Sequence, residues 1–324
     1  MKNKKIRWGI LGCGRIAHKF ASDLRTVDSA VLQAVASKDE NRANTFGETH
    51  NATTCYDNYQ ALVSNPEIDV IYIATPHTFH FEHTLLCLKH KKAVLCEKPM
   101  GISIAQVQQM IHLAEQNEVF LMEALWTAFL PHYQFVKELI VSKKYGEILE
   151  ITADFGINVA FDTENRLYNK ELGGGSLLDI GIYPIFLALD LLGVPKEISA
   201  KATIGKTVID EDCEVELEHN NKVTSKLFSS IKKKTATEAI IKLERAEIMI
   251  NGRFHEPSSV TVTEGNKYET FNFPVETFGY NFEIEHVNKM LQQGNKESDI
   301  MPLSKSLELI TTLDTIRKRI NLEY

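Results

Sequence analysis

Apolar residues in the first third of the chain fall into short runs, separated by longer stretches in which they recur at every third or fourth position. The short runs predict strands at 6–11, 31–37, 70–74, 93–96 and 119–122. The longer stretches predict helices at 16–24, 40–49, 59–64, 79–90 and 104–116. Strands that alternate with helices are typical of a parallel sheet covered on both faces. The pattern therefore predicts a doubly wound Rossmann domain over residues 1–124.

The pattern changes after Leu125, where a predicted helix at 130–143 leads into strands without regular intervening helices. Strand-like runs follow at 148–155, 198–204, 213–219, 223–231, 238–243, 247–250, 259–263 and 268–273. Further helices are predicted at 176–192, 282–293 and 303–320. Successive strands of this kind form mainly antiparallel sheets. The sequence thus predicts a second, α+β domain over residues 125–324, in which helices flank a large open sheet.

Size and charge agree with two domains and a small-molecule partner. The chain has 324 residues, more than a single hydrophobic core usually supports. Its 36 basic and 43 acidic side chains give a net charge of −7, which argues against a general surface for nucleic acids or anionic membranes.

The compartment is indicated by the start of the chain and by its cysteines. The segment 1–7 has the positive charge of a signal-peptide n-region, but the apolar stretch behind it is short and broken by Gly9 and Gly12. No uninterrupted apolar run has the length that a membrane span requires. The five cysteines, at 13, 55, 87, 96 and 213, form neither a disulfide framework nor a close pair. We therefore expect a cytoplasmic protein.

A glycine motif follows the first predicted strand and opens the first helix. Gly12 permits a tight turn, Gly14 lets the backbone approach a pyrophosphate, and Ala17 allows close packing of helix on strand. With Arg15 and Ile16 in the first helical turn, the pyrophosphate would lie at the helix amino end, where unpaired N–H groups favour an anion. An ordinary glycine turn is the alternative, but the strand–turn–helix context favours a dinucleotide site.

The end of the second strand distinguishes NAD from NADP. NAD-binding proteins usually place an acidic residue there to bind the ribose 2′-hydroxyl. Here Ser37 and Lys38 follow the strand and Arg42 comes soon after, so that a hydroxyl and two cations suit a 2′-phosphate. Solvated surface charges are the alternative, and Asp39 leaves NAD open. We expect NADP, with NAD possible.

Lys98 lies in the sequence Glu97-Lys98-Pro99, directly after the strand at 93–96. The carboxyl ends of parallel strands are where open α/β sheets bind their ligands. Burial and a positive nicotinamide ring would lower the pKa of Lys98 toward a range useful for proton transfer. A surface lysine paired with Glu97 is the alternative.

Thr75 and Pro76 follow the end of another predicted strand, so their loop should border the nicotinamide, with His80 among the cofactor contacts. His77, His80 and His83 have a spacing that invites a test for zinc. No cysteine or carboxylate cluster completes a ligand set, so we expect no metal.

Three segments in this order and spacing resemble the glucose-fructose oxidoreductase and inositol dehydrogenase (Gfo/Idh/MocA) family. They are 12–17, 97–99 and the run Gly-Gly-Gly-Ser-Leu-Leu-Asp-Ile-Gly-Ile-Tyr-Pro at 173–184. With the run 122–131, which contains Trp126, the chain is most similar to dimeric dihydrodiol dehydrogenases and NADP-dependent xylose dehydrogenases. The resemblance implies the fold, a nicotinamide cofactor contacted also by Glu97 and Trp126, and a homodimer formed through the C-terminal sheet.

The resemblance also implies proton-transfer roles for Lys98 and Tyr183. Asp179 and Tyr183 are four residues apart and project from one face if their segment is helical. An adjacent Lys98 ammonium would stabilise the Tyr183 phenolate, while Asp179 orients the substrate or the lysine. The alternative is a carboxylate near a helix amino end and a tyrosine that anchors the core. Arg166 and Tyr168, in the segment 156–172, are expected to contribute substrate contacts.

The function expected is hydride transfer between NAD(P) and a secondary alcohol or carbonyl of a sugar, polyol or trans-dihydrodiol. Either Tyr183 or Lys98 would take the hydroxyl proton. Tyr183 stands where inositol dehydrogenases commonly have histidine, which weakens an inositol assignment. A non-catalytic NADP-binding sensor on the same fold is the alternative, since fold alone does not establish activity. A reductase of another kind, such as an imine reductase, is a third interpretation.

Overall fold

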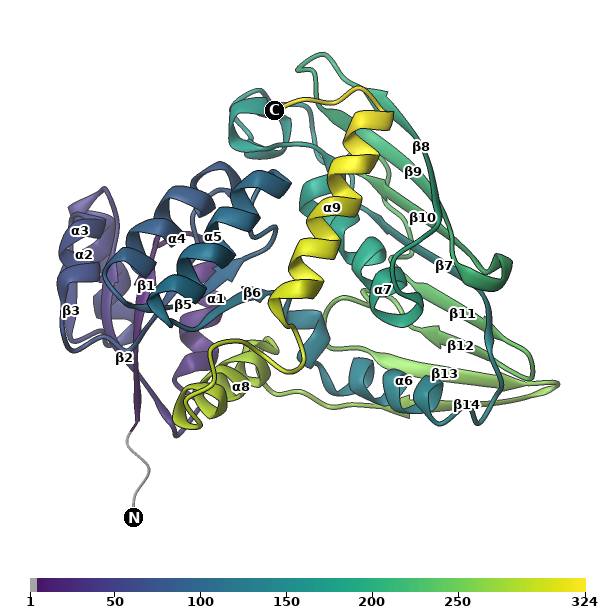
Figure 1. The fold of residues 1–324 in the computed structure, drawn as a ribbon, viewed down its shortest axis with the longest axis horizontal. Helices are drawn as coiled ribbons and strands as arrows, with labels where there is room; N and C mark the ends of the chain where they lie inside the picture. The colour runs from purple at the N-terminus through teal and green to yellow at the C-terminus, as the bar shows by residue number, and fades with distance from the viewer. Residues whose placement is uncertain (1–4) are drawn as a thin grey trace. The chain divides into compact units, whose positions relative to one another are not determined.

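The computed structural model describes residues 5–324 (Figure 1). The start of the segment at 1–7, residues 1–4, lies outside the described residues. The chain forms two compact units. The first unit comprises Met1–Trp126 and Val275–Ser306, and the second comprises Thr127–Pro274 and Leu307–Tyr324. The predicted boundary near residue 124 differs from these units mainly in 275–306, a segment that returns to the first unit.

The first unit contains a six-stranded sheet, parallel throughout, within the described residues. Its order is β3 (Thr54–Tyr56), β2 (Ala30–Ala36), β1 (Ile6–Leu11), β4 (Val70–Ile73), β5 (Ala93–Glu97) and β6 (Leu121–Ala124). Its helices are α1 (Arg15–Leu24), α2 (Glu40–His50), α3 (Tyr59–Ser64), α4 (His80–Lys89), α5 (Ile104–Asn117) and α8 (Tyr280–Gln292). The predicted Rossmann domain is confirmed. The sequence pattern missed β3, since three half-buried residues are too few to show a period.

Helix α8 belongs to the first unit because α1 and β1 bind it. Asp23 at the end of α1 accepts hydrogen bonds from the backbone N–H groups of Phe278 (3.1 Å) and Tyr280 (2.8 Å). The Trp8 indole donates to the Asn288 amide oxygen at 2.9 Å. Asp23 therefore caps a helix more than 250 residues later in the chain, a relation that no local pattern reveals.

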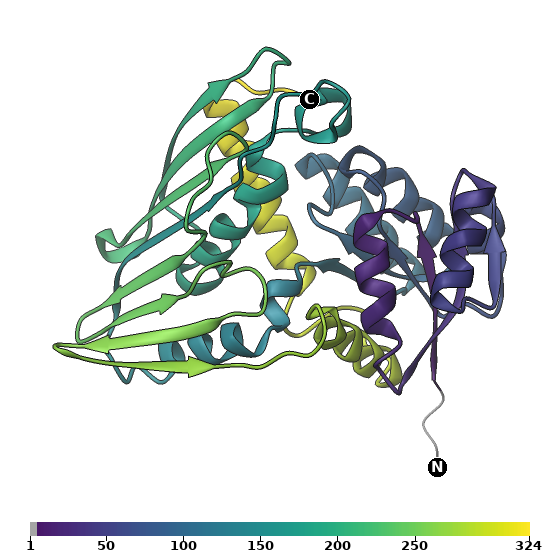
Figure 2. The ribbon, with the colours of Figure 1, turned by 180° about the vertical axis from the view of Figure 1, so that it is seen from behind.

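The second unit contains an eight-stranded sheet in the described chain (Figure 2). Its order is β14 (Lys267–Asn272), β13 (Ser259–Glu264), β12 (Glu247–Ile250), β11 (Ala239–Leu243), β7 (Ile148–Gly156), β10 (Thr224–Ser230), β9 (Asp210–Glu218) and β8 (Glu197–Ile204). Only the pairing of β7 with β10 is parallel among these described strands. The predicted, mainly antiparallel sheet is therefore confirmed.

Helices of the second unit cover one face of this sheet (Figures 1 and 2). They include α6 (Pro131–Val141), α7 (Ile182–Leu192) and most of α9 (Leu303–Arg319). The predicted helix at 176–192 begins as a five-residue π-helical turn, η5 (Leu177–Gly181), and continues as α7. Pro184 is the third residue of α7 and has no N–H group to donate back to a carbonyl of η5.

One described helical stretch, Lys170–Leu192, is long and apolar enough to cross a membrane by length and composition alone. The sequence pattern had not singled it out, because the run is interrupted by polar residues. In the structure 83% of its apolar window is buried inside the protein. A core helix passes the same compositional test, and packing within the unit accounts for this one.

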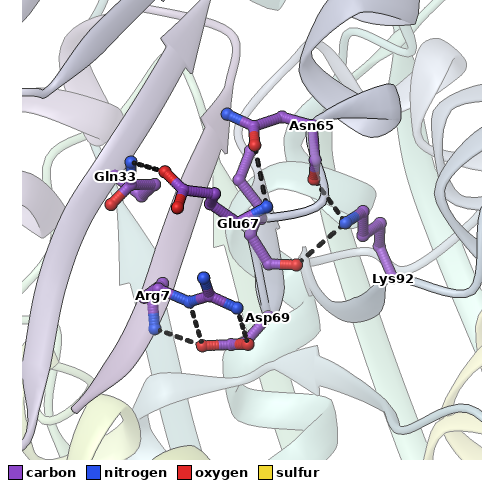
Figure 3. Close-up of polar contacts among 7 residues, drawn as sticks. Arg7, Gln33, Asn65, Glu67, Asp69 and Lys92 are labelled. Atoms are coloured by element: carbon purple, nitrogen blue, oxygen red, sulfur yellow. Dashed lines mark hydrogen bonds and ion pairs between the residues drawn. The ribbon is translucent and has the colours of Figure 1, made fainter.

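Polar contacts tie together the amino ends of the first unit's strands (Figure 3). Arg7 donates from its backbone N–H and its guanidinium to both carboxylate oxygens of Asp69, at 2.8–3.0 Å. The Lys92 ammonium donates to the carbonyls of Asn65 (2.5 Å) and Ile68 (2.9 Å). Burial lowers the pKa of Lys92, and Asp69 partly opposes this effect. These hydrogen bonds fix the segments before β4 and β5 at the amino ends of the strands. Ligands of open α/β sheets bind at the opposite, carboxyl ends.

We expect Lys92→Met to lower the free energy of unfolding by about 1–3 kcal/mol, since it leaves two buried carbonyls without their donor. Urea unfolding followed by circular dichroism would measure the loss. The exposed Lys89 at the end of α4 offers the control, and Lys89→Met should change stability by less than about 0.5 kcal/mol. Equal stability of the two variants would contradict a fixing role for Lys92.

Candidate functional site

The turn between β1 and α1 requires glycine at its first position. Gly12 has φ +99°, and a Cβ atom there would lie 3.0 Å from both the Ala74 carbonyl oxygen and the Thr75 methyl. The Gly12 N–H donates to the Ala36 carbonyl at 2.9 Å. The turn is therefore held tightly against the ends of β2 and β4.

The amino end of α1 is open and carries no protein anion among the described residues. Gly14 is its N-cap without a side-chain hydrogen bond, and the first turn contains no acidic residue. A Cβ atom at Gly14 would contact only the Ala74 carbonyl oxygen, at 3.9 Å. Arg15 is exposed, Ile16 is half-buried and Ala17 is fully buried. These residues fit a pyrophosphate at the helix amino end.

The turn after β2 carries the cations Lys38 and Arg42, and its one carboxylate, Asp39, is engaged in hydrogen bonding. Ser37 accepts from the Asp39 N–H at 3.2 Å, and Asp39 accepts from the Arg42 N–H at 2.9 Å as the N-cap of α2. The Arg42 guanidinium lies 4.0 Å from the Asp39 carboxylate, with both side chains more than half exposed. Asp39 is thus engaged as a helix cap, which weakens the alternative that it binds a ribose hydroxyl.

Lys38 projects over two aromatic rings. Its ammonium lies 5.9 Å from the centre of the Tyr59 ring and 5.4 Å from that of the Phe79 ring. Cation–π attraction favours this position. The rings therefore hold a positive charge near the carboxyl end of β2.

The loop after β4 is tied down by histidines. The two ring nitrogens of His80 lie 2.7 Å from the Thr75 and Pro99 carbonyl oxygens, and its side chain is fully buried. Burial, with His77 adding to it, lowers the pKa of His80 to about 3. His83 lies 3.0 Å from the Thr75 hydroxyl. His80 thus joins the loop at Thr75 and Pro76 to the turn after Lys98, and its predicted cofactor contact stays a prediction.

No group of three or more histidine, cysteine or acidic side chains that could hold a metal ion occurs among residues 5–324. The Glu82 carboxylate lies 3.2 Å from Nε2 of His83, but it does not join His77, His80 and His83 into such a group.

Glu97 and Lys98 occupy the carboxyl end of β5. Glu97 is buried and accepts a short hydrogen bond from the Tyr72 hydroxyl, while Lys98 is half-buried. The Lys98 backbone N–H donates to Glu97 at 3.3 Å, and the Lys98–Pro99 peptide is cis. Glu97 therefore supports the turn that carries Lys98.

Two buried acids near this turn escaped the sequence analysis. Glu123 accepts from the Met100 N–H at 2.8 Å, and burial raises the pKa of Glu123 to about 7, with Lys98 partly opposing. Glu283 of α8 is fully buried, and neither carboxylate oxygen has a hydrogen-bond partner in the described structure. Burial and the charge of Glu97 raise the pKa of Glu283 well above its usual value. Acidic residues in amphipathic strands and helices suggest exposure, so sequence alone gave no signal.

Trp126 stacks on Tyr280, with 4.4 Å between ring centres and 8° between planes. Its side chain is 6% exposed. The structure thus places Trp126 in an aromatic cluster of the first unit, and a contact with the cofactor remains a prediction.

In the second unit, η5 and α7 carry Asp179 and Tyr183. The Arg166 guanidinium donates to both Asp179 oxygens at 3.0 Å. The fully buried Asp210 accepts from the Ser176 hydroxyl (2.7 Å) and the Leu177 N–H (2.6 Å) and so fixes the start of η5. Arg166 and Asp179 therefore form a pair, a partnership that the sequence analysis did not assign.

Tyr168 is fully buried and donates from its hydroxyl to the Val159 carbonyl at 2.8 Å. It shapes the loop that carries Arg166, and its substrate contact stays a prediction. Lys98 belongs to the first unit and Tyr183 to the second, and their joint action on one substrate remains a prediction too.

Two family models match the chain. Residues 6–125 match the oxidoreductase family with an NAD-binding Rossmann fold, and residues 133–252 match the GFO/IDH/MocA C-terminal domain. The chain belongs to the Gfo/Idh/MocA oxidoreductase family. Family membership confirms the resemblance stated from the motifs, and with it an NAD(P)-dependent oxidoreductase that acts on CH–OH groups.

Relatives within the Gfo/Idh/MocA family span nearly the whole chain. Trans-1,2-dihydrobenzene-1,2-diol dehydrogenase of Xenopus laevis is 36% identical over 330 residues, covering 98% of this chain and 99% of its own. The Homo sapiens enzyme of that name is 31% identical over 333 residues, with 98% of each chain covered.

Solved structures of other enzymes share the fold. An aldose-aldose oxidoreductase from Caulobacter crescentus has a TM-score of 0.90 at 20% identity, and 98% of each chain is covered. A 3-ketoreductase from Actinomadura kijaniata, solved with NADP and TDP-benzene, has a TM-score of 0.89 at 24% identity over 98% of each chain.

Substitutions at Gly12 and Gly14 should distinguish an effect on folding stability from an effect on cofactor binding. We expect Gly12→Ala to lower the free energy of unfolding by about 1–3 kcal/mol, through its left-handed backbone and the contact with Ala74. Gly14→Ala should leave stability within about 0.5 kcal/mol and weaken NADPH binding at least about tenfold, because its methyl occupies the path of the pyrophosphate. Thermal unfolding and calorimetric titration would measure both effects. Unchanged NADPH affinity in Gly14→Ala would contradict the assignment.

Proposed function

We propose that this enzyme transfers hydride between NADP and a secondary alcohol or carbonyl of a sugar, polyol or trans-dihydrodiol. The observation that carries the proposal lies in the first unit, where Lys98 and the open amino end of α1 occupy the same edge of one parallel sheet. Ligands bind at this edge in open α/β sheets. Full-length similarity to dihydrodiol dehydrogenases supports the substrate class.

The preference for NADP rests on the turn after β2. Lys38 and Arg42 present two cations there, whereas Asp39 is engaged as the cap of α2. A 2′-phosphate would be bound by these cations and by the Ser37 hydroxyl. The fold neighbour solved with NADP is consistent with this choice.

The chemistry is assigned to Tyr183, Lys98 and Asp179. When bound, the nicotinamide supplies the hydride acceptor or donor. In the oxidation direction the Tyr183 phenolate, which the Lys98 ammonium stabilises, takes the substrate's hydroxyl proton and becomes a neutral phenol. In the alternative assignment a neutral Lys98 amine takes the proton and becomes an ammonium. Asp179 is held by Arg166 at 3.0 Å and orients the substrate hydroxyl.

A non-catalytic NADP-binding sensor is the competing function. A sensor of this kind would be indicated by the replacement of Lys98 or Tyr183. This chain retains both residues. Cofactor binding without turnover on any substrate would favour the sensor.

We also infer a homodimer formed through the uncovered face of the eight-stranded sheet. Strand register aligns Thr152, Lys226 and Glu216 across that face, and a neighbouring row aligns Phe228 with Glu214. A hollow of about 580 Å³ lies over these strands. Opposite charges beside apolar groups suit a surface that pairs with a copy of itself.

A cytoplasmic location is part of the same proposal. All five cysteines, each within the described residues, are free thiols, as expected in a reducing compartment.

Cofactor selectivity should depend on Lys38. We expect Lys38→Ala to weaken NADPH binding by about ten- to a hundredfold, since a charge-assisted hydrogen bond contributes about 1.5–3 kcal/mol. NADH binding should stay within about twofold, because NADH lacks the 2′-phosphate. Fluorescence titration with both cofactors would measure this, with Lys89→Ala as an exposed control. Equal losses for NADPH and NADH would contradict the phosphate role.

Turnover should depend on Lys98 and Tyr183. We expect Lys98→Ala and Tyr183→Phe to bind NADPH within about threefold of the wild type and to lose at least about a hundredfold in kcat. A panel of sugars, polyols and diols, followed by reduced-nicotinamide absorbance, would measure the rates. The exposed Tyr268 offers a matched control, and Tyr268→Phe should keep full activity. Wild-type rates in both site variants would overturn the assignment.

A further inference from the structure

The glycine run 173–175 lies between the two members of the Arg166–Asp179 pair. Arg166 precedes the run, and Asp179 follows it in η5. Gly173 and Gly175 have φ values of +72° and +114°, which residues with a side chain rarely adopt. Glycines also contribute no side chain that could anchor the run. The geometry of the pair therefore depends on the contacts that other segments make with the run.

The segment that carries Arg166 makes the first of these contacts. The Gly174 N–H donates to the Asn169 carbonyl and the Gly175 N–H donates to the Leu167 carbonyl, both at 2.9 Å. A Cβ atom at Gly174 would lie 2.7 Å from the Arg166 carbonyl oxygen. The glycine run and the segment before it are thus packed in direct contact, so a displacement of one moves the other.

Tyr324 binds the glycine run from 150 residues later in the chain. Its hydroxyl donates to the Gly174 carbonyl, and a Cβ atom at Gly175 would lie 3.0 Å from the same hydroxyl oxygen. Burial, to which the charge of Asp210 adds, raises the pKa of Tyr324 well above its usual value, so the hydroxyl keeps its proton and remains a donor. The phenol of Tyr324 thus fixes the middle of the run.

The segment that follows α9 holds the phenol in place. The Leu322 N–H donates to the Arg317 carbonyl at 2.9 Å, and the Leu322 side chain is buried. The Arg317 guanidinium carbon lies 5.4 Å from the centre of the Tyr324 ring, a distance at which cation–π attraction acts. Because these contacts already restrict the side chain, Tyr324 loses little further conformational entropy when it binds the glycine run.

We propose that Tyr324 is a positioning residue for the substrate site, because its hydrogen bond to the glycine run fixes the geometry of the Arg166–Asp179 pair. The inference rests on the proposed role of Asp179 in orienting the substrate hydroxyl. Without this hydrogen bond the pair would occupy several positions, and only one of them would accept the substrate. The apparent affinity for the substrate then falls in proportion to the population of that position. Tyr324 acts through the run and takes no part in proton transfer.

Tyr324→Phe tests the hydrogen bond, because phenylalanine keeps the ring but cannot donate. We expect the backbone N–H groups of Gly174 and Gly175 to exchange with deuterated solvent about three- to tenfold faster, as the loss of one hydrogen bond implies. Hydrogen exchange of peptides that cover 166–178, followed by mass spectrometry, measures this without turnover. Unchanged exchange would overturn the proposal.

Steady-state kinetics test whether the hydrogen bond serves the substrate site. For the sugar, polyol or diol that the wild type turns over fastest, we expect Tyr324→Phe to raise KM about three- to tenfold and to keep kcat within about threefold. NADPH affinity should stay near that of the wild type. A loss of stability alone would reduce the folded fraction, which lowers kcat and leaves KM unchanged. An unchanged KM would therefore overturn the positioning role.

Tyr133→Phe is the matched control. It also removes a phenol hydroxyl that donates within the second unit, to Asp190 at 2.9 Å, and it should leave exchange at 166–178 and KM unchanged. Tyr324→Ala is a second variant in case the first fails to fold, and wild-type exchange and KM in it would count against the proposal. If the wild type turns over no substrate, the proposed function fails, while hydrogen exchange still decides whether Tyr324 holds the glycine run.

Discussion

The first unit depends on one close backbone contact, the approach of Gly12 to the end of β4. Because a side chain at Gly12 would meet the Ala74 carbonyl at 3.0 Å, only glycine lets β1 turn there and still bind Ala36. That contact sets where α1 begins. It thereby brings the amino end of α1 to the edge of the sheet where Ser37 follows β2 and Lys98 follows β5. Functional residues on several loops lie close together because the loops follow the carboxyl ends of neighbouring parallel strands.

Most of the architecture could be predicted from periodicity, because long elements bury one face and show it in sequence. The Rossmann strands and the antiparallel run after residue 147 follow such patterns. The three-residue β3 is too short to show such a pattern. The membership of α8 in the first unit could not be predicted either, because the contact between Asp23 and Tyr280 depends on tertiary packing. The domain assignment from the sequence was contiguous for that reason.

The residues of the candidate site also fall into those that the sequence could predict and those that it could not. The glycine motif and Lys98 could be found from position relative to strand ends, which is a local property. The pairing of Arg166 with Asp179 and the burial of Glu283 could not, because each depends on side-chain packing. Residue type indicated which groups can ionise, and only packing showed which of them face one another.

The cap that Asp23 provides for α8 also constrains how the protein is made. The chain leaves the ribosome with its amino end first, and domains generally fold as they emerge. Here the Trp8 indole and the Asp23 carboxylate bind Asn288 and Tyr280, which are translated more than 250 residues later. The nucleotide-binding unit therefore completes its fold only after the whole antiparallel sheet has been synthesised, and the face of α1 that binds α8 stays without that partner until then.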